Sequence, residues 1–213
     1  MGTPKPEPKL APAELSMILA RLAAVDEKLA ALTAPPPPAF DPLDTLVVIC
    51  TYPSGQAHPA IFAALEANGI PKTAIQISDH RDTVGARNAS VRDQIFPSGK
   101  STAILFDADM IPGKATERFW KTPGDIVGAY YPSGDLRHWE NGNVHCGMMR
   151  VNVEVFQTLP APWFQLTRDA YGANMLQCEG NYLTSRARAA GFTVKQAGFC
   201  AHSGKHEGCT QPY

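Results

Sequence analysis

An apolar run that ends at two aspartates constrains the fold more than any other stretch of the sequence. The run covers residues 103–110 and reads AILFDADM. Its length and its polar flanks are typical of an inner strand that is covered on both faces. Ligands of open α/β sheets gather at the carboxyl ends of such strands, so the two aspartates are candidate ligands. Strand alternation would point Asp107 and Asp109 to one side, where carboxylate oxygens suit Mg²⁺ or Mn²⁺ beside a diphosphate. A strand that merely ends in an Asx turn is the alternative.

Composition limits the class of protein. The 213 residues, 44% of them hydrophobic, are enough for one sizeable core and an appendage. Nineteen basic and 20 acidic residues give a net charge of −1, which provides no strong field for nucleic acid or an anionic membrane. No apolar stretch approaches the roughly 20 residues of a membrane span, and the N-terminus lacks a signal-peptide core, so a soluble, cytoplasmic protein is expected. The five cysteines are odd in number and scattered, which favours reduced thiols over a disulfide framework.

The N-terminal part of the chain differs from the rest. Residues 1–12 are rich in Pro and Lys and are predicted to be a disordered tail. Residues 13–33 are predicted to form an amphipathic helix, whose seam consists of Leu15, Ile18, Leu22, Val25, Leu29 and Leu32. Such a helix needs a cover for its apolar face, and we expect a homo-oligomer of three or four strands through residues 14–33. A helix lying on its own domain is the alternative. A Pro-rich linker, 34–43, then precedes the main domain, 44–213.

The main domain alternates between strand-like and helix-like segments. Strands are predicted at 46–50, 73–77, 103–110, 125–129 and 192–196, and helices at 57–68, 83–94 and 182–190. Strand, helix and strand at this spacing form a βαβ unit with a right-handed crossover. Residues 130–147 are rich in aromatic, Gly and amide residues, the composition of a loop that contacts sugars. A Gly-rich surface loop with a packed Trp is the alternative there.

The order of these parts resembles that of nucleotide-sugar glycosyltransferases with the GT-A fold, particularly the family 2 type and its small bacterial or phage relatives. The resemblance covers about residues 44–206 and rests on four anchors. They are Thr51-Tyr52-Pro53, Ala86-Arg87-Asn88, Asp107-Ala108-Asp109, and Glu179 leading into residues 186–192 with His202 behind it. The element at 162–164 is familiar from the same relatives.

The resemblance implies a GT-A (Rossmann-like) α/β fold, with a mixed, mostly parallel sheet flanked by helices. It implies a metal-dependent transfer of a sugar from a nucleoside-diphosphate sugar, with a UDP-sugar favoured, to an unknown acceptor hydroxyl. Glu179 would be the general base. The nucleotide would lie against Thr51, Tyr52, Pro53, Arg87, Asn88 and Asp107; Mn²⁺ (or Mg²⁺) against Asp107, Asp109 and His202; and the sugar or acceptor against Trp139, Asn143, Gly147 and Trp163. The chemistry agrees, because expelling a diphosphate calls for a cation and the acceptor hydroxyl calls for a carboxylate.

Two departures from the family pattern stand out. Gly180 follows Glu179 where the family usually has Asp, and the loop after the first strand lacks the family's usual asparagine. The acceptor is left open among a glycan, a small molecule, a protein or DNA, and the near-neutral charge gives DNA no support.

Three other hypotheses remain open. Cys200, His202, His206 and Cys209 could together bind zinc. A nucleotidyltransferase could use the same aspartate pair, although residues 51–56 contain no Lys or Arg for a triphosphate. The third is a non-catalytic oligomeric carbohydrate-binding or assembly protein on the same fold.

Overall fold

The computed structural model describes residues 16–17, 21–22, 40–51, 55–80, 82–131, 144–168, 170 and 175–203. The chain divides into two units, 1–36 and 37–213. In the first unit, residues 16–17 and 21–22 are helical, and the side chains of Met17 and Leu22 are exposed. The rest of the predicted tail, helix and linker lies outside the described residues, so the coiled coil and the oligomer stay predictions.

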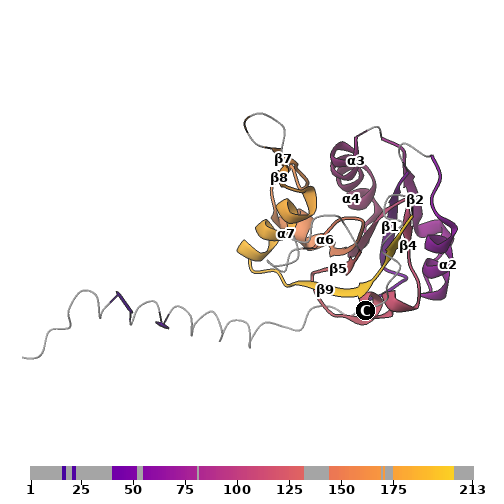
Figure 1. The fold of residues 1–213 in the computed structure, drawn as a ribbon, viewed down its shortest axis with the longest axis horizontal. Coiled ribbons are helices and arrows are strands. Elements are labelled where there is room, and N and C mark those ends of the chain that lie inside the picture. Colours follow the sequence, from indigo (N-terminus) through magenta and orange to yellow (C-terminus); the bar gives the residue numbers. More distant parts are fainter. Residues whose placement is uncertain are drawn as a thin grey trace, which may run out of the picture. The chain divides into compact units, whose positions relative to one another are not determined.

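The second unit is built on a six-stranded sheet with the order β2-β1-β3-β6-β5-β9 (Figure 1). The strands are β1 (Thr45–Cys50), β2 (Ile75–Ser78), β3 (Thr102–Asp107), β5 (Ile126–Tyr130), β6 (Met148–Asn152) and β9 (Val194–Phe199). β1 runs parallel to β2 and β3, and β5 runs parallel to β9, whereas β6 is antiparallel to both of its neighbours. The prediction of a mixed, mostly parallel sheet is confirmed.

Helices connect the strands and cover the sheet. They are α2 (Pro59–Ala67), α3 (Thr83–Ser90) continuing through a π-helical turn η2 (Val91–Ile95) into α4 (Phe96–Ser98), α5 (Glu117–Lys121), α6 (Val153–Thr158) and α7 (Glu179–Ala189). Short elements complete the description: η1 (Lys72–Ala74), β4 (Met110–Ile111), η3 (Lys114–Thr116), β7 (Thr167–Arg168), β8 (Met175–Gln177) and β10 (Ala201–His202). No helix in the described part of the chain has the length and apolar character needed to cross a membrane.

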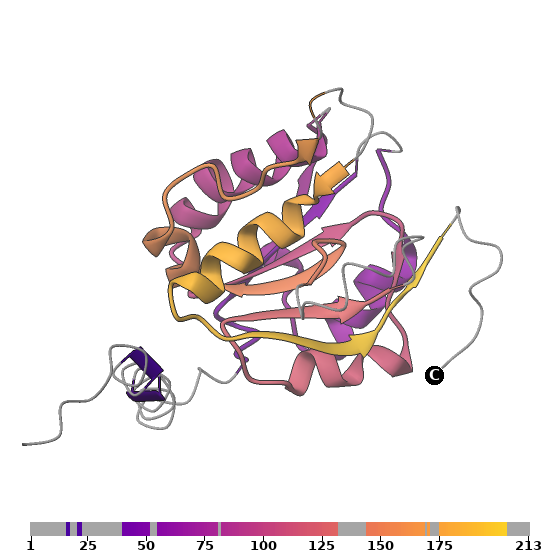
Figure 2. The same ribbon diagram turned by 60° about the vertical axis from the view of Figure 1, so that its left-hand side comes forward.

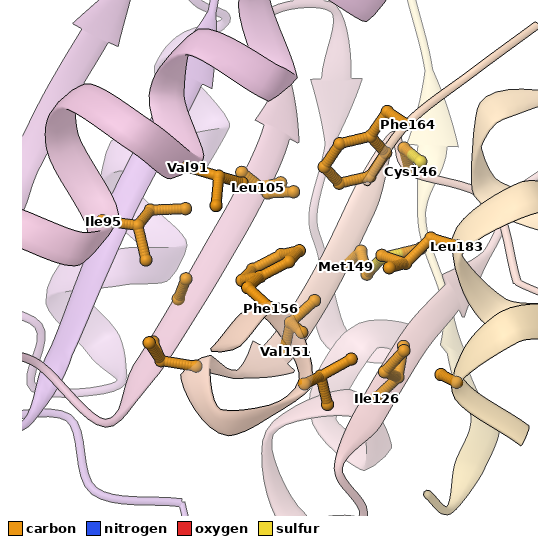
Figure 3. Close-up of a cluster of buried hydrophobic side chains, with 14 of the residues drawn as sticks. Val91, Ile95, Leu105, Ile126, Cys146, Met149, Val151, Phe156, Phe164 and Leu183 are labelled. Atoms are coloured by element: carbon orange, nitrogen blue, oxygen red, sulfur yellow. The ribbon is translucent and has the colours of Figure 1, made fainter. Parts of the chain in front are cut away.

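The sheet separates two apolar clusters because successive strand residues point to opposite faces. On one face, Val48 and Leu105 pack against side chains of η2, α6 and α7 (Figure 3). On the other, Ile49 and Phe106 pack against α2 and α5. Figure 2 shows α3 and α7 on one side of the sheet and α5 on the other. Both faces are therefore covered, as the continuous apolar strands require.

The strand predicted over residues 103–110 is shorter than expected. β3 ends at Asp107, residues 108–109 form a turn, and β4 begins at Met110. The backbone of Ala108 holds the turn in place, since its N–H donates to Cys50 O (3.0 Å) and its carbonyl accepts from His58 N (2.7 Å). Strand alternation therefore does not extend to Asp109, and it does not relate the directions of the two aspartates.

The carboxyl ends of the parallel strands meet at one edge of the sheet. Thr51 follows β1, Asp107 closes β3, and Tyr131 follows β5. Because β6 runs the other way, its first residues also lie at this edge, and Gly147 immediately precedes it. The fold thus collects residues from distant parts of the sequence at the edge where α/β proteins bind ligands.

Candidate active site

Arg87 lies at the centre of the candidate site. The Asp82 side chain caps α3 by accepting from Gly85 N (2.7 Å), and Arg87 follows one turn later with 1% of its surface exposed. Its Nη1 donates to Glu179 Oε1 (2.5 Å), and its Nη2 donates to Asp107 Oδ1. One side chain therefore joins α3, the end of β3 and the start of α7.

The two carboxylates stabilise the charged form of this arginine. Burial alone lowers the pKa of a guanidinium, but the carboxylates of Asp107 and Glu179 raise the pKa of Arg87 well above its ordinary value. Arg150, which is also buried, shows the contrast. It donates to the backbone carbonyls of Phe119 and Trp120, and burial lowers its pKa to about 10. Arg87 thus remains a full positive charge beside two negative ones.

Close packing of backbone against α7 fixes the position of Glu179. Glu179 is the first residue of α7, after the N-cap Cys178. A Cβ on Gly180 would lie 2.5 Å from Val144 O, so no side chain fits there. Position 180 is therefore restricted to glycine, because the segment before β6 occupies the space of a side chain.

Asp109 and His202 form a second polar pair. β10 pairs antiparallel with β4, with His202 opposite Met110, and this brings His202 Nε2 to 3.1 Å from Asp109 Oδ2. The side chain of Asp109 is 46% exposed and that of His202 is 19% exposed, so the pair borders solvent. A carboxylate oxygen and an imidazole nitrogen this close fit Mn²⁺ or Mg²⁺ as two ligands of a shell completed by other oxygens. Within the described residues, no group of three or more His, Cys, Asp and Glu side chains is placed to hold a metal ion.

An aromatic side chain that the sequence did not single out lies beside this pair. The ring of Tyr131 stacks on that of His202, with centroids 5.9 Å apart and planes 12° from parallel, and is 5.4 Å from the ring of His145. A Cβ on Gly147 would lie 2.8 Å from the Tyr131 ring, so Gly147 provides the space for it. Gly147 O in turn accepts from Asp107 N (2.8 Å). The position of Tyr131 directly after a strand of the binding edge was the available signal.

Asn88 and Trp163 come together, but in the scaffold. Asn88 Nδ2 donates to Val84 O and Phe164 O, and its Oδ1 accepts from Trp163 N and Phe164 N, at 2.8–3.2 Å. Trp163 Nε1 donates to the carbonyls of Phe156 and Leu159 at 2.8 and 2.9 Å. These contacts occupy both amide donors and both acceptor positions of Asn88 and the single donor of the indole.

The other predicted site residues divide into described and undescribed ones. Thr51 is buried, and its N–H donates to Ser78 O (2.9 Å), which ties the loop after β1 to the end of β2. Tyr52, Pro53, Trp139 and Asn143 lie outside the described residues. Two of the zinc candidates, His206 and Cys209, also lie outside the described residues. For a third candidate, Cys200, burial raises the pKa of the thiol to about 12.

Comparison with known proteins extends this picture at the level of the fold. No protein-family model matches the sequence, and no curated protein matches it. The crystal structure of A197 from STIV matches with a TM-score of 0.51 and 16% identity, over 74% of this chain and 83% of that one. The mannosyltransferase PcManGT from Pyrobaculum calidifontis, in complex with GDP-Man and Mn²⁺, matches with a TM-score of 0.50 and 14% identity, over 91% of this chain and 68% of that one. At such identities the likeness concerns the fold alone, and with the observed sheet it shows that the described part of residues 37–213 has a GT-A-like α/β fold.

Proposed function

We propose that this chain is a metal-dependent glycosyltransferase that moves a sugar from a nucleoside-diphosphate sugar to an acceptor hydroxyl. The observation that carries the proposal is the Arg87 bridge between Asp107, at the carboxyl end of β3, and Glu179, at the start of α7. It gathers a donor-side and an acceptor-side carboxylate at the ligand-binding edge of a GT-A-like sheet. A mannosyltransferase with this fold, solved with GDP-Man and Mn²⁺, supports the proposal.

Glu179 is the proposed general base. The acceptor oxygen forms a bond to the anomeric carbon while the bond from that carbon to the diphosphate breaks, and the hydroxyl proton moves to the carboxylate. Arg87 holds one oxygen of Glu179, and a carboxylate has further lone pairs with which to accept the proton. Arg87 is thus a positioning residue, which acts on the donor side through Asp107.

Asp109 and His202 are the proposed protein ligands of Mn²⁺ or Mg²⁺. Asp107, Asp109 and Glu179 carry three negative charges and Arg87 one positive charge, which leaves −2 at the site and suits a divalent cation. When bound, the cation supplies positive charge for the departing diphosphate. Asp107, already fixed by Arg87, would then face the ribose or the metal.

Thr51, Tyr52 and Pro53 are the residues we propose for the nucleotide, with a UDP-sugar as the favoured donor. Gly147 borders the site, and Trp139 and Asn143 belong to the loop proposed to contact the sugar or acceptor. Asn88 and Trp163 are assigned to the scaffold, because their polar groups bond to backbone.

The test is turnover of a donor panel with Mn²⁺, followed as release of nucleoside diphosphate. Asp109→Asn should abolish release, because it removes a charged ligand of the cation. Glu179→Gln should lower transfer by about 10²–10⁴-fold, the usual contribution of a general base, while donor binding by calorimetry stays unchanged. Equal loss of donor binding in Glu179→Gln would show that Glu179 has a structural role.

One observation favours a non-catalytic carbohydrate-binding protein as the alternative. The proposed base is held in an ion pair with a buried arginine, which would also suit a carboxylate kept only for binding. If the donors bind with Mn²⁺ but no diphosphate is released with any acceptor, this alternative replaces the enzyme.

A further inference from the structure

We infer that Tyr131 is a positioning residue that holds the imidazole of His202 in the orientation needed for metal binding. The inference rests on the proposed function, since it assigns a metal to Asp109 and His202. It concerns a residue that neither the sequence motifs nor the family resemblance assigned.

The first observation is the geometry of the rings. The planes of Tyr131 and His202 are 12° from parallel with centroids 5.9 Å apart, an offset-stacked arrangement that aromatic pairs prefer. The contact from His202 Nε2 to Asp109 Oδ2 holds one atom of the imidazole ring. The stacked phenol ring of Tyr131 restrains the plane of the imidazole, a role comparable to that of the outer partners of metal-binding histidines.

The second observation is that Tyr131 itself has a fixed place. Gly147 lies directly against the hydroxyl-bearing side of the ring, and a Cβ there would come within 2.8 Å of Cε1, Cζ and Oη. The carbonyl of Gly147 accepts from Asp107 N, so this contact surface is tied to the end of β3. His145 contacts Tyr131 as well, with centroids 5.4 Å apart.

The third observation is the packing of the phenol. Tyr131 is partly buried and packs against the apolar cluster that contains Phe106 and Met148. Tyr131 thus contacts His202 on one side and, through Gly147, the backbone of Asp107.

The test uses the full chain and Mn²⁺ alone, with Mn²⁺ affinity measured by electron paramagnetic resonance. Tyr131→Phe keeps the ring and should bind within about twofold of the unmodified protein. Tyr131→Ala removes the ring, and Gly147→Ala displaces it by adding a methyl group. Both should weaken Mn²⁺ binding by about tenfold, the lower end of the effect of outer-shell changes. Phe40→Ala is the matched control, because its ring packs on Trp120 and Arg150 and its loss should leave the affinity unchanged.

A second readout is independent of metal. In the metal-free protein, the ring-proton chemical shifts of His202 should change in Tyr131→Ala and Gly147→Ala, but not in Phe40→Ala. If Tyr131→Ala does not fold, as judged by circular dichroism, Mn²⁺ affinity and the His202 chemical shifts are both measured on Gly147→Ala. Unchanged Mn²⁺ affinity in the ring-displacing variants overturns the role of Tyr131 alone. An unmodified protein that binds no Mn²⁺ overturns the proposed metal site, and the assignment of Tyr131 with it.

Discussion

Arg87 donates to two carboxylates that follow it in the chain by 20 and 92 residues. Removing one partner from a buried charge cluster leaves the others uncompensated. Arg87→Met should therefore lower the free energy of unfolding by about 3 kcal/mol, the low end of the range for buried pairs, since Asp107 and Glu179 are partly exposed. Chemical denaturation followed by circular dichroism measures the loss.

Arg92 provides the control for that experiment. It lies five residues further along, in η2, and pairs with Asp93 at an exposed position. Arg92→Met should leave the unfolding midpoint unchanged, because exposed ion pairs are screened by solvent. Equal midpoints for the two variants would mean that the Arg87 bridge does not stabilise the fold.

Buried thiols give the protein a pH dependence of their own. Burial raises the pKa of Cys50 to about 11 and that of Cys200 to about 12, from an ordinary value of 9.0. Between pH 9 and 11 the unfolded chain has lost these protons and the folded chain keeps them, so stability falls as pH rises. The expected slope is about 1 kcal/mol per pH unit for each thiol.

Denaturation at a series of pH values measures this slope. Cys200→Ala should make it shallower above pH 9, because one of the contributing protons is gone. An unchanged slope in Cys200→Ala would contradict the assignment to this thiol.

Among the elements, α3 and the segment at 163–164 depend on one amide. Asn88 makes four hydrogen bonds: three tie the helix to this segment, and one returns to Val84 O within α3. Asn88→Ala should cost about 2–4 kcal/mol of unfolding free energy at roughly 1 kcal/mol per bond. Asn68→Ala is the matched control with one such bond, to Ala64 O, and should cost about 1 kcal/mol. Equal losses in urea titrations would show that the bonds of Asn88 do not hold these elements together.

Sequence reasoning found the order of the elements because their signals are local. A few neighbouring residues are enough to recognise the apolar runs of β1 and β3 and the βαβ spacing. The turn at 108–109 could not be predicted in this way, because it depends on backbone hydrogen bonds to Cys50 and His58 and on the pairing of β4 with β10. The pairing is set by packing between segments far apart in the chain, which spacing along the sequence does not show.

The site residues show the same limit. The motif at 86–88 predicted two nucleotide contacts, which stay predictions. In the structure Arg87 donates to Asp107 and Glu179, and Asn88 bonds to backbone, contacts that the motif did not indicate. Asp109 and His202, predicted as metal ligands, do lie together. That they bind metal stays a prediction. The contact of Tyr131 with His202 was not predicted, because it comes from stacking between segments far apart in the chain rather than from a motif.

For the whole molecule, the untested prediction is association through residues 14–33. Deleting residues 1–34 should give a monomer in light scattering, because the predicted apolar seam is removed. The matched variant is Leu22→Glu in the full chain, which places a charge in the seam and should lower the mass as well. An unchanged mass in both proteins would assign any association to residues 37–213.

The Arg87 bridge has a thermodynamic consequence for ligand binding at the site. In the proposed function Asp107 faces the donor side and Glu179 the acceptor side, and the two carboxylates share one guanidinium through its separate nitrogens Nη2 and Nη1. Any ligand that draws Asp107 away from Arg87 changes the hold on Glu179, and linkage requires the reverse effect to be equal in free energy. Donor and acceptor affinities should therefore depend on each other through a single buried side chain, without movement of the sheet.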